Sequence, residues 1–157
     1  MSVEIFNGTM QKFGAPDTVI CQFKYWSVLL RPAQLTLGAL VLVAHEPVQS
    51  FSALSSVSFA ELQIVTGKVD SALKKTFQYD KLNYLMLMMV DPDVHFHVIP
   101  RYAQAREFAG KVFYDAGWPG VPDFSKINET GKEMNQQIIS QLISCREFSR
   151  ETGCHGG

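Results

Sequence analysis

The sequence predicts a single α+β domain built on one antiparallel sheet. Short apolar segments occur near the start of the chain and again in its middle, with one long amphipathic segment between them and another near the C-terminus. Successive strands with no helix between them favour antiparallel pairing. A chain of 157 residues can form one domain with its own core. We expect residues 1–150 to form this domain and residues 151–157 to be a disordered tail.

The predicted strands are short runs rich in valine, leucine, isoleucine or aromatic residues. Two runs around Lys24-Tyr25 can pair as a hairpin. Asp91-Pro92 indicates a turn between two later strands. In chain order, the predicted strands cover residues 20–23, 26–30, 38–44, 82–90, 94–102 and 108–114.

Two amphipathic helices are expected. In residues 58–77 Ser58 and Glu61 form a candidate capping box, and apolar residues then recur at spacings of three and four. A second helix is predicted to begin near Thr130, with Glu133 completing another capping box. The apolar residues of the first helix are Leu62, Val65, Val69, Leu73 and Phe77.

Charge and cysteine content narrow the possible functions. A net charge of -1 gives no general attraction to nucleic acid or to an anionic membrane. Three widely spaced cysteines without a C-x-x-C pair form neither a disulfide framework nor a zinc knuckle. The sequence shows no signal peptide pattern, and its longest apolar run, residues 85–90, is too short to span a bilayer. We therefore expect a cytoplasmic protein.

The segment from Asp93 to Arg101, Asp-Val-His-Phe-His-Val-Ile-Pro-Arg, carries the candidate chemistry. On a strand, Asp93, His95 and His97 would share one face, with neighbours about 7 Å apart. Three interpretations stay open at this point. One imidazole attacks phosphorus as a nucleophile, the three groups bind a metal, or they form a hydrogen-bonded row with a structural role only.

This segment resembles the signature of the histidine triad family, His-φ-His-φ-His-φ-φ with φ apolar, which Pro-Arg often follows. The run from Arg31 to His45 and the helix after it also resemble the family, and the resemblance covers about residues 19–102. The resemblance is to a divergent branch of the family, similar to bacterial members often labelled diadenosine tetraphosphate hydrolase-like. The resemblance implies a five-stranded antiparallel sheet with a long helix, a homodimer and a purine nucleotide ligand.

The resemblance also implies an activity, the cleavage of a nucleoside monophosphate group from its leaving group through a nucleotidyl-histidine. His95 matches the nucleophile and His97 the histidine that contacts the phosphate, and no metal or cofactor is required. Asp93 is expected to support the site, and Arg101 either contacts phosphate or pairs with a surface acid. The expected nucleotide-binding residues are Val28, Leu30, Arg31 and Leu42. The substrates implied are dinucleoside polyphosphates, nucleoside phosphoramidates and adenylated small molecules.

Three positions depart from the family pattern. Asp93 replaces the first histidine, Ala39 replaces a further histidine, and Arg31 stands where an Asp or Asn usually holds the ribose. A carboxylate beside His95 would favour the imidazolium, which helps phosphate binding but weakens the nucleophile. The alternative function is therefore a nucleotide-binding sensor or adaptor with weak catalysis. A metal site at Asp93, His95 and His97 lacks a convincing fourth ligand nearby.

Overall fold

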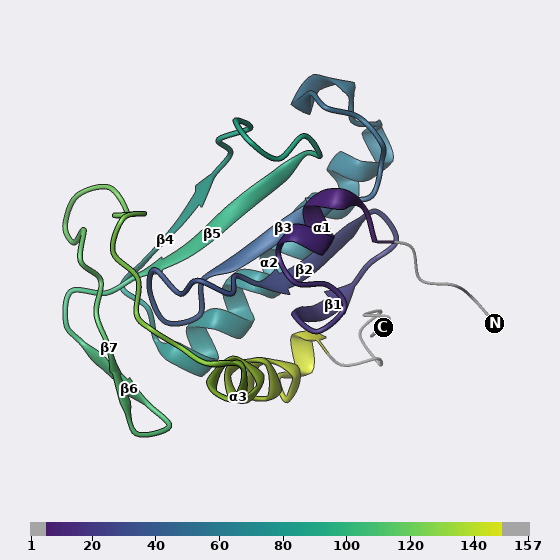
Figure 1. Ribbon diagram of the computed structural model, residues 1–157. Helices are drawn as coiled ribbons and strands as arrows, with labels where there is room; N and C mark the ends of the chain where they lie inside the picture. Colours follow the sequence, from purple (N-terminus) through teal and green to yellow (C-terminus); the bar gives the residue numbers. More distant parts are fainter. Residues whose placement is uncertain (1–5, 149–157) are drawn as a thin grey trace.

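A five-stranded antiparallel sheet with the strand order β1-β2-β3-β5-β4 forms the centre of the computed structural model (Figure 1). The structure describes residues 6–148, so the tail expected at residues 151–157 lies outside the described residues. The α+β class and the single main sheet are confirmed. The strands are β1 Val19–Gln22, β2 Trp26–Leu30, β3 Leu40–Ala44, β4 Lys81–Leu85 and β5 His95–Arg101.

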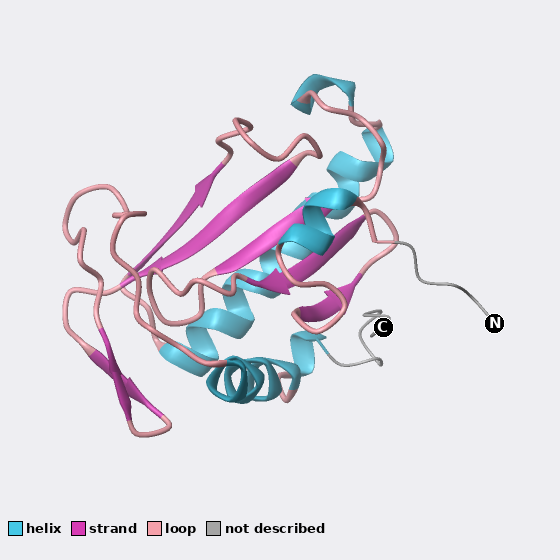
Figure 2. Ribbon diagram, viewed as in Figure 1, coloured by secondary structure: helices cyan, strands magenta, loops and turns pink. Residues whose placement is uncertain are grey.

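Helices cover both faces of this sheet (Figure 2). The long helix α2, Ser56–Phe77, crosses one face, and the short helix α1, Gly8–Lys12, lies on the other. Helix α3, Lys132–Ile143, packs beside α2 and β1. Among the described helices none is long and apolar enough to cross a membrane. The remaining elements are the 3₁₀ turns η1 Phe51–Ala53 and η2 Arg146–Phe148 and the strands β6 Arg106–Phe108 and β7 Lys111–Phe113.

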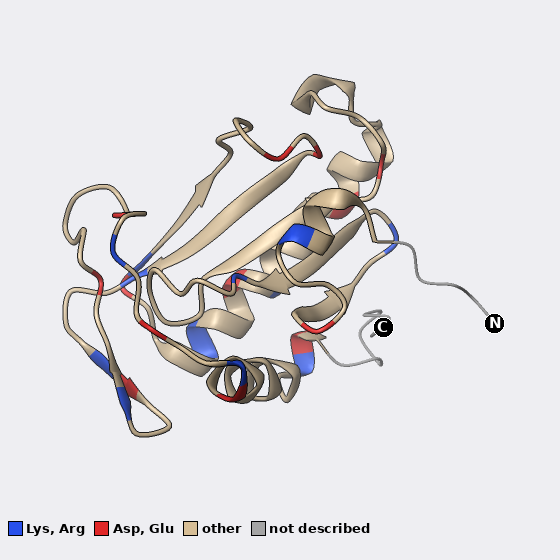
Figure 3. Ribbon diagram, viewed as in Figure 1, with Lys and Arg blue, Asp and Glu red and all other residues tan. Residues whose placement is uncertain are grey.

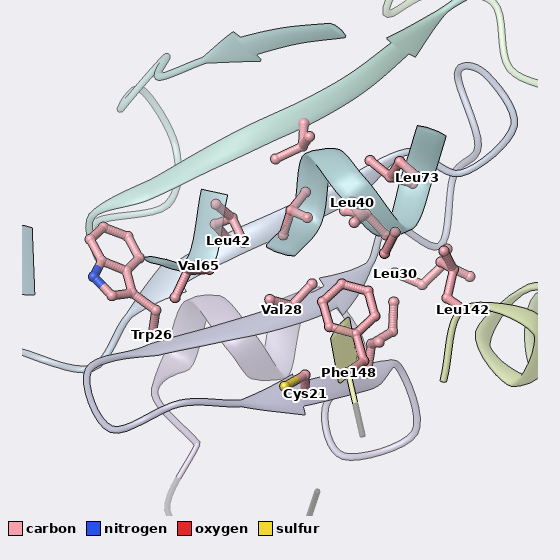
Figure 4. Close-up of a cluster of buried hydrophobic side chains, with 14 of the residues drawn as sticks. Cys21, Trp26, Val28, Leu30, Leu40, Leu42, Val65, Leu73, Leu142 and Phe148 are labelled. Atoms are coloured by element: carbon pink, nitrogen blue, oxygen red, sulfur yellow. The ribbon is translucent and has the colours of Figure 1, made fainter. Parts of the chain in front are cut away.

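Side-chain alternation along the strands creates two apolar clusters of unequal size. The larger cluster lies between the sheet and α2, where Val28, Leu40 and Leu42 pack with Val65 and Leu73 (Figure 4). The smaller cluster lies under α1 and contains Met10, Leu29, Val41 and Val43. The face under α1 is therefore apolar where it borders α1, and this is the face that carries the histidines.

Two predicted strands are wrong in their extent. The strand predicted over residues 82–90 ends at Leu85, because Met88 has a left-handed φ of 52° and the apolar residues after Leu85 lie in a loop. The strand predicted over residues 108–114 is a hairpin instead. It turns at Ala109-Gly110, whose φ values of 50° and 81° require a tight turn, and it forms a separate two-stranded sheet.

Both predicted capping boxes are also wrong. Ser55 caps α2, accepting a hydrogen bond from the Ser58 backbone N–H at 3.3 Å, while the Ser58 hydroxyl donates to the Glu46 carboxylate. Glu61 accepts instead from the backbone N–H of Tyr25 at 2.7 Å. The N-cap of α3 is Gly131, without a side-chain cap, so Thr130 and Glu133 do not form the predicted pair. The apolar stripe of α2 is confirmed for Val65, Val69, Leu73 and Phe77, whereas Leu62 is only half-buried.

Replacing a buried residue of α2 should destabilise the fold far more than replacing an exposed one. Leu73 is fully buried, so Leu73→Ala should lower the free energy of unfolding by about 2–5 kcal/mol. Ile64 on the same helix is 58% exposed, and Ile64→Ala should change it by only about 0.5 kcal/mol. Urea denaturation of both variants measures this, and equal effects would contradict the described position of α2.

Candidate functional site

His95 and His97 lie side by side on the sheet face under α1. Their ring centroids are 5.3 Å apart and the rings are nearly perpendicular, at 80°. On β3, the residues opposite them are Val43 and Val41, respectively. Both imidazoles are buried, with 2% and 6% of their residue surface exposed. This face of the sheet therefore carries a buried pair of neighbouring imidazoles.

The tautomer of His95 is fixed by the backbone. Its Nδ1 lies 2.7 Å from the carbonyl oxygen of Asp93, and a carbonyl oxygen can only accept a hydrogen bond. Nδ1 therefore carries the proton and donates it to this bond, leaving the lone pair on Nε2. A neutral imidazole with an available Nε2 lone pair is the form that attacks an electrophile.

The Asp93 side chain does not join the histidine row, contrary to the expectation. Its carboxylate accepts from the backbone N–H and the hydroxyl of Thr9, at 3.2 and 2.8 Å. The Asp93 N–H donates to the same hydroxyl oxygen at 3.3 Å. This reciprocal set of bonds, with the 2.8 Å ion pair of Lys12 and Asp91, ties α1 to the segment before β5. Residues 6–148 contain no group of three His, Cys, Asp or Glu side chains placed to hold a metal.

Two phenylalanine rings cover the imidazoles. The Phe13 ring centroid is 6.2 Å from that of His95 and 5.8 Å from that of His97. On the other side, Phe124 packs edge-on against His97 at 5.6 Å. Neither Phe13 nor Phe124 could be predicted from the sequence. Each lies in an irregular segment, and loop residues carry no periodic pattern that would indicate which face they contact.

Arg31 reaches the same place from the end of β2. Its Cζ lies 5.4 Å from the centroid of Phe124, and its Nη1 donates to the carbonyl of Ala33 at 2.6 Å. Burial lowers the pKa of this guanidinium. Burial likewise lowers the pKa of His97 to about 4, with the positive charge of Arg31 and the proximity of His95 acting in the same direction and Asp91 opposing them. His97 is therefore a neutral imidazole at neutral pH.

The expected apolar slot for the base lies on the wrong face of the sheet. Val28, Leu30 and Leu42 are fully buried in the core beneath α2 (Figure 4). Because side chains alternate along a strand, these residues cannot also face the histidines. The residues of β2 and β3 that do face them are Leu29, Val41 and Val43.

Arg101, at the far end of β5, is paired with a buried acid. Its Nε and Nη2 donate to the two oxygens of Asp115 at 2.7 and 3.1 Å, and its Nη1 donates to Asn83 at 2.8 Å. Both charged side chains are at most 5% exposed. Figure 3 shows positive charge where β4 begins and β5 ends, while the strands at the centre of the sheet are free of charged residues. Arg101 and Trp118 line a separate hollow of about 750 Å³ along β4, which the histidines do not line.

Comparison with known proteins defines the class. The model of the HIT domain family matches residues 12–104, more than half of the chain. The chain therefore belongs to the histidine triad family, and the HIT fold expected from the sequence is confirmed. No curated protein matches it.

Solved structures give the same fold. A histidine triad protein from Bradyrhizobium japonicum aligns with a TM-score of 0.70 and 23% identity, over 92% of this chain and 98% of that one. A histidine triad protein from Sinorhizobium meliloti aligns with 0.70 and 21%, over 88% and 94%. A hypothetical histidine triad nucleotide-binding protein from Sulfolobus tokodaii aligns with 0.58 and 20%, over 80% and 83%.

The environment of His97 can be tested by its titration. Followed by NMR, His97 should protonate only as the pH falls to about 4, below the ordinary value of 6.5. Arg31→Gln should raise its pKa without restoring the ordinary value, because burial is the larger cause. The matched control is Arg106→Gln, on β6, which should leave the titration unchanged. A wild-type His97 that titrates at its ordinary pKa would contradict the buried site.

Proposed function

We propose that the protein is a nucleotide-binding hydrolase or transferase that cleaves a nucleoside monophosphate group through a nucleotidyl-histidine intermediate. The family membership supports a nucleotide ligand, as does the Sulfolobus tokodaii structure, which is named as a nucleotide-binding protein. The proposed substrates are dinucleoside polyphosphates, nucleoside phosphoramidates or adenylated small molecules. The single observation that carries the proposal is the hydrogen bond from His95 Nδ1 to the Asp93 carbonyl oxygen.

This hydrogen bond prepares His95 for attack. The Nε2 lone pair forms a bond to phosphorus while the bond from phosphorus to the leaving group breaks, and the leaving group departs with that electron pair. As charge develops on the imidazole, the Nδ1 proton stays held by the Asp93 carbonyl. Water or an acceptor alcohol or amine then attacks phosphorus and loses one proton to solvent, while the N–P bond breaks and its electrons return to Nε2. The nucleoside monophosphate is released or transferred.

His97 and the apolar residues around the pair supply the rest of the site. A neutral imidazole can donate a hydrogen bond to a phosphate oxygen. Because it is neutral, it adds no second buried charge to that of Arg31 before the ligand binds. Leu29, Val41 and Val43 keep water from this face of the sheet, which strengthens polar interactions with the phosphate. We propose that the nucleotide phosphate occupies the space next to both imidazoles once the phenylalanine rings allow entry.

The second candidate function is a nucleotide sensor or adaptor with little turnover. The observation that favours it is the burial of both histidines beneath Phe13 and Phe124. In this arrangement, ligand binding has to displace at least one ring, which would couple nucleotide binding to a movement of the surface. The absence of an imidazole at positions 39 and 93 also favours this second function.

Substitution of His95 separates the two functions. His95→Asn removes the nucleophile but keeps a polar side chain, so turnover should fall by on the order of a thousandfold or more. Nucleotide binding, followed by calorimetry, should persist because His97 and the apolar residues remain. His97→Asn should weaken binding and turnover together. Wild-type protein that binds a nucleotide but turns over none of the three substrate classes would leave only the sensor function.

We further propose a homodimer formed along β4. This strand is an edge of the sheet, whereas the opposite edge, β1, is short and interrupted by a bulge between Val19 and Cys21. An unpaired edge is a template for a strand of another chain. The loop after β4 also exposes large apolar side chains, namely Leu87, Met89 and Val90.

The dimer can be tested by light scattering at micromolar concentration. The wild type should have the mass of a dimer. Met89 is 85% exposed, so Met89→Lys should shift the mass toward the monomer without unfolding it. Val112 on β7 is the control, since Val112→Lys introduces the same charge away from β4. A monomeric wild type would rule the dimer out.

A further inference from the structure

Arg31 carries a charge that the described part of the chain does not neutralise. Within residues 6–148 its guanidinium makes no ion pair, and its only hydrogen bond goes to a backbone carbonyl. Its Nε is buried without any partner. Arg101 shows the opposite situation, because Asp115 neutralises it. A buried N–H without an acceptor costs stability, and an anion placed there would remove that cost.

His97 presents a second unpaired group beside Arg31. Its Nδ1 is buried and has no hydrogen-bond partner among residues 6–148, and the whole residue is only 6% exposed. His97 lies on β5 and Arg31 directly follows β2, and the Phe124 ring centroid is 5.6 Å from the His97 ring centroid and 5.4 Å from the Arg31 Cζ. Two buried polar groups without partners among the described residues therefore lie against one aromatic ring.

Strand register places Arg31 on the far side of His97 from His95. Leu29 pairs with Val41, and Val41 pairs with His97. Arg31 comes two residues after Leu29, and its backbone N–H donates to the carbonyl of Ala39 at 3.0 Å. Across the strands, Leu29, Val41 and His97 form one row of paired residues, and Arg31 lies two residues beyond this row. His95 lies two residues from this row on the opposite side. Two residues span about 7 Å along a strand.

We infer that Arg31, with His97 lying between it and His95, binds a second anionic group of the substrate on the far side of His97 from the phosphorus that His95 attacks. This inference rests on the proposed function, because it takes the scissile phosphate to lie at His95. The ligand class is a nucleotide that carries an additional phosphate, either in its polyphosphate chain or on its ribose. A guanidinium suits this role because it presents paired N–H donors to phosphate oxygens.

The test compares ligands that differ by one phosphate. Calorimetry should show that adenosine 5′-diphosphate or adenosine 3′,5′-bisphosphate binds the wild type about tenfold to a hundredfold more tightly than adenosine 5′-monophosphate. The ligand with the larger increase in affinity shows whether the second phosphate lies in the polyphosphate chain or on the ribose. Arg31→Gln should abolish the gain, whereas the control Arg106→Gln should keep it.

Each remaining outcome is informative. If the monophosphate binds but a second phosphate adds nothing, or if the gain survives in Arg31→Gln, the inference is wrong and the proposed function stands. If no nucleotide binds, the proposed function itself fails. If Arg31→Gln melts too early for titration, Arg31→Lys decides, because it keeps the charge but loses the paired donors. The gain should then shrink several-fold, and an undiminished gain would overturn the inference.

Discussion

Strand β5 contributes side chains to both faces of the sheet, and the rest of the site depends on which of its residues lie on which face. Its even-numbered residues Phe96 and Val98 pack on the core side with α2, while His95 and His97 face α1. Shifting the register by one residue would bury the imidazoles in the main core and expose the apolar side chains. The pairing with β3 and β4 on both sides prevents such a slip, so these two hydrogen-bond ladders set the position of the imidazoles.

The segment before β5 adds a second constraint. Asp93 is bonded to Thr9 through its side chain and to His95 through its carbonyl oxygen, so one residue connects α1 to the imidazole. In this chain the carboxylate thus anchors a helix, and the backbone of the same residue orients the His95 ring. The residue at the position of the first signature histidine therefore holds α1 through its side chain and orients His95 through its backbone.

Much of the fold could be predicted because its strands are short, apolar and consecutive, and because α2 has a strong apolar periodicity. The histidine pair could be found for the same reason, since alternation on one strand is a local property. The rest depends on contacts distant in sequence. Thr9 lies 84 positions from Asp93 and Phe13 lies 84 from His97. Phe124 lies 27 positions from His97 and 93 from Arg31. Val28, Leu30 and Leu42 were assigned to the site because apolar residues alone do not show which face of a sheet they occupy.

The most direct test of the account is the detection of the covalent intermediate. Wild-type protein mixed with an adenylated substrate and quenched rapidly in base should show, by intact-protein and peptide mass spectrometry, one added nucleoside monophosphate on His95. The His95→Asn protein should show none. Turnover without any such adduct, or an adduct that persists when His95 is replaced, would contradict the assignment of His95 as the nucleophile.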